Sequence, residues 1–356
     1  MIATLQEWAI TGELLQLAFA IPMVTAALVA LTGRWPNVRD GIGLLGGLAL
    51  LPISIILAKS VIAGNEPTAH LAQMLPNVAL AFKLEPLGAL FALVASLLWP
   101  IATLYSIGYI RGNNEPRQTV FFTCFAAAIA ATLGIAFSSN LLSLFVFYEA
   151  LTFSTYPLVT HKGDENSRQA GRKYLGILVG TSVVFLLFAI LWSYQLAGHG
   201  EFTSGGFLPA DMSPLNVSCL LALFAFGIGK AALMPVHGWL PAAMVAPTPV
   251  SALLHAVAVV KAGVFTVIKV VVYVFGLDLL AGSSGTGWLM VVAGCTTVTA
   301  SAIALQQDNL KRRLAYSTIG QLAYVVLAVS LFTPEATLGA TLHIAGHAFG
   351  KITLFF

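Results

Sequence analysis

Three ionisable residues, Glu149, Lys230 and Lys261, lie near the middle of three separate long apolar stretches of the chain. Only 9% of the residues are charged, and an ion in hydrocarbon is disfavoured by several kcal/mol, so such groups usually mark an ion or proton path. Burial lowers the pKa of a lysine amine towards neutral pH, and a nearby carboxylate raises it again. We therefore expect Glu149 to be a switchable partner of a buried lysine. A protonated carboxyl that hydrogen-bonds a neighbouring helix is the structural alternative.

A polar stripe occurs towards the end of the sequence, where His343, His347 and Lys351 follow one another at intervals of four residues. This spacing places them within about 80° of one helix face. Imidazole titrates near neutral pH, so we interpret the stripe as a proton relay. Zinc is the alternative for two histidines one turn apart, but the stretch HIAGH lacks the glutamate of the metalloprotease motif, and no third ligand is evident. His255 is either a further relay member or a core histidine.

Membrane-spanning helices must position these side chains. Apolar residues make up 58% of the 356 residues and the mean hydropathy is +0.90, whereas soluble proteins average roughly 45–50% apolar residues. Strands of a membrane barrel would alternate apolar and polar residues over about 10 positions, a pattern that is not seen. The sequence therefore predicts an all-α polytopic membrane protein. About eleven segments approach the roughly 20 apolar residues of a transmembrane helix: 14–33, 41–63, 87–110, 118–137, 140–160, 174–197, 215–234, 249–275, 286–306, 312–332 and 335–356.

The seventh of these helices is predicted to be broken. Four prolines, the first of them Pro235, and Gly238 interrupt the apolar residues 233–254. Proline removes a helical hydrogen bond and clashes with the preceding turn, so a straight helix cannot continue through Pro235. Lys230 would then lie one turn before the break, where interrupted helices expose polar groups to a water-filled cavity. A proline kink that serves packing alone is the alternative.

Two segments that connect predicted spans, and one further lysine within a span, also have recognisable patterns. Residues 64–86 alternate apolar positions between prolines, which predicts a short extracytoplasmic hairpin or a structured loop. The charged residues 161–173 are expected to form a solvated loop face or a short surface helix, because Asp164 and Arg168 are four residues apart. Lys269 lies near a helix end, and we expect its amine to reach the membrane surface.

Basic residues set the expected orientation. Most Lys and Arg of the connecting segments follow odd-numbered spans, as Arg34, Arg111, Lys162 and Arg312 do. By the positive-inside rule these connections are cytoplasmic. We therefore expect a multi-pass protein of the cell (inner) membrane with an extracytoplasmic N-terminus.

No cofactor is expected in the chain. No Gly-rich phosphate loop follows a strand. Cys124, Cys219 and Cys295 are far apart and without metal-ligand spacing, so neither an iron–sulfur centre nor another metal site is predicted. The basic segments are short and scattered, which argues against nucleic-acid binding. A quinone-reducing enzyme subunit is therefore disfavoured, and a passive scaffold would not need charges in mid-membrane.

Four stretches resemble one family: LLSLFVFYEALTFSTYPLV (141–159), GKAALMPVHGWLPAAMVAPTPVSALLHAVAVVKAGVF (229–265), LKRRLAYSTIGQLAYV (310–325) and HIAGHAFGK (343–351). They are similar to the antiporter-like subunits shared by respiratory complex I, multi-subunit sodium/proton antiporters and membrane-bound hydrogenases. Within this family, FYEALTFSTYPLV with VVKAGVF is most similar to the D-type subunit of the sodium/proton antiporter.

The resemblance implies roles for the buried residues. In the family a glutamate on helix five pairs with a lysine on the broken helix seven, and a Lys or His on helix eight passes protons along a central hydrophilic axis. By motif these residues are Glu149, Lys230 and Lys261. The stripe on helix eleven, His343, His347 and Lys351, matches the polar run of that helix in the family.

The resemblance also implies a domain organisation. Family members carry two inverted five-helix repeats, so residues 1–117 would hold helices one to three with the hairpin, and 118–275 the complete first repeat of helices four to eight. Residues 276–356 would begin the second repeat, from helix nine, and leave it cut short. Family members continue for about three more helices, so we expect a C-terminally truncated fragment.

The function implied is a proton-translocating subunit of a monovalent cation (sodium)/proton antiporter. The alternative is a proton-pumping membrane-arm subunit of NADH:quinone oxidoreductase (complex I) or of a membrane-bound hydrogenase. In either case the expected partners are other membrane subunits of a hetero-oligomeric assembly, protons and sodium, with no redox centre in this chain.

Overall fold

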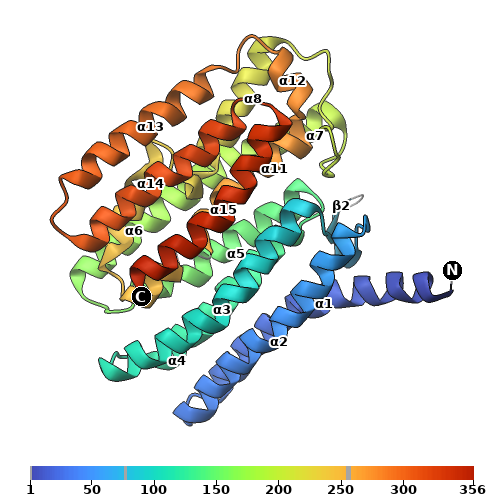
Figure 1. The fold of residues 1–356 in the computed structure, drawn as a ribbon. Coiled ribbons are helices and arrows are strands. Elements are labelled where there is room, and N and C mark those ends of the chain that lie inside the picture. Colours follow the sequence, from blue (N-terminus) through green and yellow to red (C-terminus); the bar gives the residue numbers. More distant parts are fainter. Residues whose placement is uncertain (1, 76–77, 254–257) are drawn as a thin grey trace.

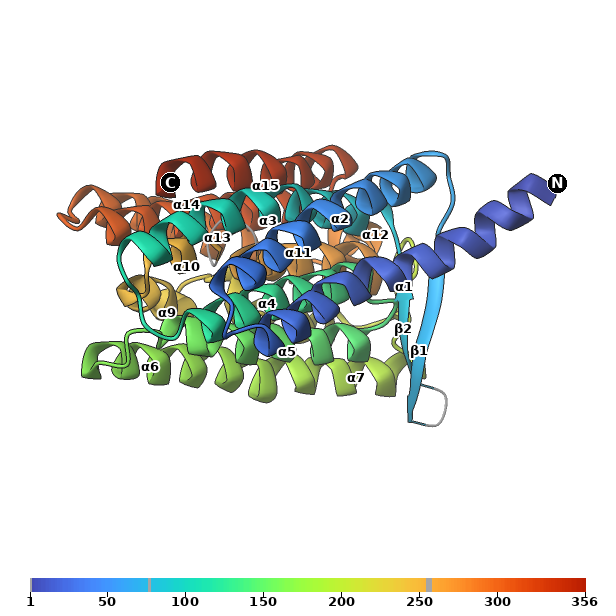
Figure 2. The ribbon, with the colours of Figure 1, turned by 90° about the horizontal axis from the view of Figure 1, so that it is seen from below.

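The computed structural model describes residues 2–75, 78–253 and 258–356, with side chains from residue 12 onward except that of residue 75. Long α-helices run side by side, and a short β-hairpin stands across their ends at one end of the bundle (Figures 1 and 2). The predicted all-α polytopic membrane fold is confirmed, with the hairpin as its strand element.

The first five helices account for the N-terminal half of the bundle. They are α1 (Ile2–Leu31), α2 (Pro36–Ile62), α3 (Pro86–Gly112), α4 (Gln118–Phe137) and α5 (Leu141–Val159). Proline stands at the first position of α2 and α3, where its missing N–H costs nothing. The side chain of Asn140 accepts a hydrogen bond from the Ser143 amide at 2.8 Å and begins α5. The predicted spans 118–137 and 140–160 agree with α4 and α5 to within one residue.

The hairpin predicted within residues 64–86 is present. Strands β1 (Thr68–Leu75) and β2 (Val78–Lys83) are antiparallel, with Thr68 paired to Lys83. A bridge between Phe82 and Ser138 fastens β2 to the connection from α4 to α5. The hairpin is therefore attached to the central helices as well as to its own neighbours.

The charged residues 161–173 form mostly helix. The segments α6 (Glu165–Thr181), η1 (Ser182–Leu186) and α7 (Leu187–Ala197) run on as one long span. The side chain of Asp164 accepts from the Ser167 amide at 2.7 Å, and this cap starts the helix before the apolar residues begin. Of the two expectations for this segment, the helix is therefore confirmed from residue 165 on, and the loop was wrong. The predicted start of the span at 174 was also wrong, because the cap extends the same helix outward.

Short helical pieces follow in the middle of the chain. They are α8 (Pro214–Gly227), η2 (Gly229–Ala231), η3 (Val236–Gly238), α9 (Trp239–Ala242), η4 (Ala243–Val245), α10 (Thr248–Ala252), α11 (Val259–Val270), η6 (Val271–Phe275) and α12 (Leu277–Gly282). The broken seventh span is therefore confirmed. Helix α11 lies inside the bundle, and every one of its residues is buried.

The last three helices pack beside one another (Figure 1). They are α13 (Trp288–Leu305), α14 (Leu310–Val329) and α15 (Pro334–Phe355). Helix α15 also contacts α3 and α11, so the polar stripe of α15 is brought next to the centre of the molecule.

Within the described residues, seven helical segments are long and apolar enough to cross a membrane by length and composition. The other predicted spans correspond to α8, to α10 with α11 and η6, and to α14 and α15. These are shorter or carry more polar side chains. The predicted count of about eleven spans stays a prediction.

Candidate functional site

The break in the seventh span begins earlier than the sequence predicts. Helix α8 ends at Gly227, and Lys230 lies within the 3₁₀ turn η2. Ala232 has a φ of 53°, in the left-handed region, which no regular helix contains. Pro235 and Gly238 begin and end the next short turn. The prediction that Lys230 lies one helical turn before the break was therefore wrong. Lys230 lies within the break, because the prolines mark only the C-terminal side of the irregular segment.

Side chains from other elements satisfy the backbone groups that the break frees. The Lys230 amide donates to the Tyr148 hydroxyl at 3.0 Å, and the Met234 amide donates to Thr296 Oγ1 at 3.3 Å. The buried Trp239 indole N–H donates to the Gly229 carbonyl at 3.0 Å. An unsatisfied buried amide or carbonyl costs about 1–3 kcal/mol, so these contacts stabilise an irregular backbone in the centre of the bundle.

The amine of Lys230 is fully buried against α5. Its Nζ donates to the Tyr148 carbonyl at 2.8 Å and to Thr152 Oγ1 at 2.6 Å. It also lies 3.2 Å from the centroid of the Tyr148 ring, whose face attracts cations. The site therefore offers oxygen acceptors and a ring face to an ammonium group.

Glu149 lies between the two α5 residues that hold Lys230. Among the described residues, its buried carboxylate oxygens have no hydrogen-bond partner. Its charge interacts through space with Lys230 and with the tyrosines Tyr148 and Tyr174. The structure thus brings Glu149 and Lys230 into one neighbourhood, where tyrosine and threonine oxygens make the direct contacts to the amine.

Lys261 on α11 is fully buried, and its Nζ lies 2.5 Å from Nδ1 of His347 on α15. Helix α11 also lies directly against the break. A Cβ added to Gly263 would lie 2.3 Å from the Lys230 carbonyl carbon and from the Ala231 amide nitrogen. Only glycine permits this approach, so Gly263 is a positioning residue that the sequence analysis missed. A glycine two residues after a buried lysine was the available signal.

The stripe on α15 continues from Lys261 towards α14. The rings of His347 and His343 stack with centroids 6.0 Å apart and planes 8° apart. Nε2 of His343 lies 2.9 Å from Gln321 Oε1. Lys351 donates to Ser317 Oγ at 2.9 Å and to the Leu314 carbonyl at 3.2 Å. All three stripe residues therefore face neighbouring helices. His255 lies outside the described residues.

Lys269 does not reach the membrane surface, so that expectation was wrong. It is fully buried, and its Nζ lies 3.2 Å from Glu85 Oε2 and donates to the Ser138 carbonyl at 2.7 Å. Glu85, which directly precedes Pro86 at the start of α3, was not among the predicted site residues. A carboxylate at the start of an apolar helix was the signal, and its partner lies 184 positions away in the sequence.

A second charge network lies near the start of α2. The carboxylate of Asp40 accepts from Arg39 Nε at 2.7 Å and from Arg111 Nε at 2.6 Å, and Arg39 and Asp40 are buried. Arg111 was expected in a connecting segment, and Arg39 lies just before the predicted span 41–63. They instead stand on α2 and α3 and join those helices, so these basic residues have a packing role.

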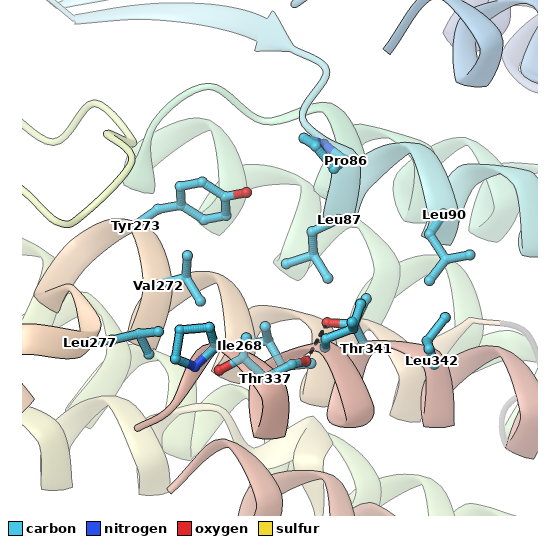
Figure 3. A pocket seen from close by; sticks show the side chains of 12 residues that line it. Pro86, Leu87, Leu90, Ile268, Val272, Tyr273, Leu277, Thr337, Thr341 and Leu342 are labelled. Atoms are coloured by element: carbon cyan, nitrogen blue, oxygen red, sulfur yellow. Dashed lines mark hydrogen bonds between the residues drawn. The ribbon is translucent and has the colours of Figure 1, made fainter. Parts of the chain in front are cut away.

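No metal site is found within the part of the chain that the structure describes, because no group of three or more His, Cys, Asp or Glu side chains lies together. A cavity of about 440 Å³ lies between α3, α11 and α15, and Figure 3 shows its lining. Leu87, Leu90, Ile268 and Val272 make much of this wall hydrocarbon. Such a wall suits an apolar chain better than an ion.

The chain is similar to known membrane proteins. Residues 138–356 match the family model described as NADH:quinone oxidoreductase/Mrp antiporter, TM. The chain is 32% identical over 288 residues to a subunit of a probable K(+)/H(+) antiporter of Rhizobium meliloti (strain 1021), with 79% of this chain and 28% of the relative covered.

Two solved structures share the fold. A chain of the membrane-bound sulfane sulfur reductase, described as an archaeal respiratory membrane complex, is similar with a TM-score of 0.84 and 27% identity, covering 96% of this chain and 69% of that one. A chain of the Mrp complex from Dietzia sp. DQ12-45-1b has a TM-score of 0.80 and 27% identity, covering 96% of this chain and 37% of that one.

The protein spans about half or less of the length of the curated relatives that it matches. The family model nevertheless covers more than half of this chain, including Lys230, Lys261 and the stripe on α15. The resemblance found in the sequence motifs is thereby confirmed, and the protein is an antiporter-like, multi-pass membrane subunit that belongs to the NADH:quinone oxidoreductase/Mrp antiporter transmembrane family.

Proposed function

We propose that the chain conducts protons through its buried ionisable side chains, within a subunit that exchanges protons for a monovalent cation, with sodium as the first candidate. The observation that carries the proposal is the direct contact between the Lys261 amine and His347, at 2.5 Å inside the bundle. An amine and an imidazole at this distance can share one proton, and a buried pair of this kind has no evident packing role.

Each contact in the proposed path assigns a role to a side chain. Lys230 holds a proton on its amine against Tyr148 and Thr152. Lys261 and Nδ1 of His347 pass a proton between them in either direction, which requires that the accepting nitrogen be unprotonated beforehand. The stacked His343 then leads the path towards Gln321.

Glu149 acts in this scheme as the modulator of Lys230. A carboxylate near a buried amine favours the charged ammonium, and a neutral carboxyl does not. Because Glu149 is close to Lys230 without a direct hydrogen bond, a small movement of α5 relative to η2 would change their interaction. Protonation of one group would then be coupled to release from the other.

The relatives support an assembly of several membrane subunits, since both solved neighbours are chains of membrane complexes. We place the hairpin and the N-terminus on the extracytoplasmic side by the positive-inside rule. The division into residues 1–117, the repeat 118–275 and residues 276–356 is part of the same proposal.

The second candidate is a proton-pumping membrane-arm subunit of a quinone oxidoreductase or hydrogenase. The family model covers both kinds of assembly, and one of the solved neighbours is an archaeal respiratory membrane complex. The two candidates differ in what drives the proton, which is a cation gradient in the first and electron transfer by a partner subunit in the second.

Proton flux in vesicles that contain the complete assembly tests the proposal. Wild type is compared with Lys230→Met and Lys261→Met, and the exposed Lys59→Met on α2 is the matched control. We expect both buried variants to reduce flux by about tenfold or more, as loss of a proton-transfer group does, while Lys59→Met keeps it. Wild-type flux in both buried variants contradicts the proposal.

The same vesicles separate the two candidates. Flux that starts on addition of sodium or potassium, without an electron donor, identifies a cation/proton antiporter. Proton flux that needs an electron donor and acceptor, and that does not depend on sodium or potassium, identifies the respiratory alternative.

A further inference from the structure

A second buried ion pair lies at the hairpin end of the bundle. Lys269 and Glu85 are 0% and 2% exposed, and Nζ lies 3.2 Å from Oε2. The Lys269 amine also donates to the Ser138 carbonyl at 2.7 Å and lies 4.5 Å from the centroid of the Phe202 ring. Removing two charges from water is unfavourable unless their contacts compensate for the lost hydration. The burial of this pair therefore needs a physical explanation.

Helix α11 connects this pair to the proposed proton path. Lys269 follows Lys261 by eight residues on the same helix, which corresponds to about 12 Å along the axis. The hydroxyl of Thr266 lies between them in sequence and is also buried. One rigid helix therefore carries both amines, one in the centre of the bundle and one at its hairpin end.

Charged residues of the hairpin lie between Glu85 and the solvent. Lys83, two residues before Glu85, is the last residue of β2 and forms an ion pair of 2.8 Å with Glu66, with side chains 28% and 54% exposed. The charges of Lys83 and Glu66 act on Glu85 through space. Ionisable groups thus continue from the buried Lys269 to the solvated hairpin.

The cavity next to this pair is mostly apolar. Pro86 and Ile268, which adjoin Glu85 and Lys269 in sequence, line the cavity shown in Figure 3 together with leucine and valine side chains, and Tyr273, Thr337 and Thr341 contribute its hydroxyl groups. Hydrocarbon of this kind does not hydrate an ion. Of the groups that contact the Lys269 amine, a backbone carbonyl and aromatic rings do not accept a proton from an ammonium group, so the Glu85 carboxylate is the acceptor of a proton that leaves Lys269.

We propose that Lys269 and Glu85 form the proton-conducting gate at the hairpin end of the path, an inference that rests on the proposed function. The Lys269 ammonium gives a proton to the Glu85 carboxylate, so that an N–H bond breaks, an O–H bond forms, and the pair becomes neutral. The Glu85 carboxyl then releases the proton towards the hairpin and water, and Lys269 takes the next proton from the side of Lys261.

Lys269→Arg tests the gate against a purely structural ion pair. Arginine keeps the positive charge and the contact with Glu85, but it does not give up its proton in proteins. We expect an assembled complex with a wild-type melting temperature and proton flux at least about tenfold lower, as for loss of a proton-transfer group. Lys59→Arg, the same exchange at an exposed site of α2, is the control and should keep its flux. Wild-type flux in Lys269→Arg overturns the proposal.

The double variant Glu85→Gln with Lys269→Met decides the matter if the arginine variant does not assemble. It removes both charges and leaves none unpaired, which buried sites often tolerate. The gate predicts assembly with a similar loss of flux, whereas wild-type flux overturns it. Failure of both variants to assemble also overturns it, because the pair would then be a structural contact.

Lys230→Met, measured alongside, separates this inference from the function on which it rests. Loss of flux in Lys230→Met with full flux in the Lys269 variants overturns the gate and leaves the central path standing. Full flux in both Lys230→Met and Lys261→Met contradicts the proposed function itself.

Discussion

The amine of Lys261 lies 2.5 Å from Nδ1 of His347, although the two residues are 86 positions apart. The contact joins α11 to α15 within the core. A hydrogen-bonded amine and imidazole exchange a proton without any rearrangement of the helices. This pair therefore links the buried charge at the centre of the bundle to the histidine stripe.

Replacing His347 by phenylalanine should interrupt this link. The ring volume is retained, but the proton acceptor of Lys261 is lost, so we expect proton flux in vesicles to fall by about tenfold or more. If the two residues act in series, the double variant with Lys261→Met will be no slower than the slower single variant. A double variant whose loss of flux equals the product of the two single losses would contradict a shared step. Thr353→Val, at an exposed position of the same helix, serves as the control.

The Tyr148 hydroxyl should be required for a stable helix break. In Tyr148→Phe the ring remains beside Lys230, but the buried Lys230 amide loses its acceptor, which costs about 1–3 kcal/mol. We expect a lower melting temperature of the assembly and reduced flux. Tyr156→Phe on the same helix is the comparison variant, and equal melting temperatures for the two variants would refute the role of the Tyr148 hydroxyl.

Gly263→Ala should push α11 away from the break. The added Cβ would meet the Lys230 backbone at 2.3 Å, and strain of this kind in a packed core typically costs about 1–3 kcal/mol. Gly294→Ala on α13 is the matched control, since its Cβ meets nothing within 4 Å and alanine favours a helix by up to about 1 kcal/mol. We expect melting temperature and flux to fall only in Gly263→Ala. A neutral Gly263→Ala would show that α11 is free to shift.

The stability of the segment between α5 and α6 should depend on pH through His161. Burial, helped by the charges of Arg117 and Lys162, lowers the pKa of His161 from 6.5 to about 4. Glu115 Oε2 lies 3.7 Å from Nε2, too far for a hydrogen bond, and it does not reverse this effect. The imidazole is therefore neutral in the folded protein at pH values where it is protonated in the unfolded chain.

Because the unfolded state binds the extra proton, stability is complete above about pH 6.5 and is lost as the pH falls towards about 4. Melting temperatures of wild type and His161→Gln between pH 7 and 5 check this. We expect a smaller decline in the variant, and the exposed His199→Gln should decline as wild type does. An equal decline in all three proteins would exclude His161 as the cause.

The fold followed from the sequence wherever one helix could be recognised by its own residues. Helices α4 and α5 ended within one residue of the prediction, because long apolar runs stop at polar caps. The hairpin was recognised from its alternation between prolines. The broken seventh span was also predicted, but its start was not. Proline acts on the turn before it, whereas the helix already ends at Gly227, where tertiary contacts such as the one from Trp239 to Gly229 replace helical hydrogen bonds.

The sequence by itself determined which ionisable side chains must be buried. Glu149, Lys230 and Lys261 lie within apolar runs of helical length, so they cannot lie in the connecting segments. Tertiary structure alone decided their partners. Lys230 contacts Tyr148 and Thr152, Lys261 contacts His347, and Lys269 pairs with Glu85. Periodicity specifies which face of a helix is polar, but the neighbour of that face depends on packing between segments that are far apart in the chain.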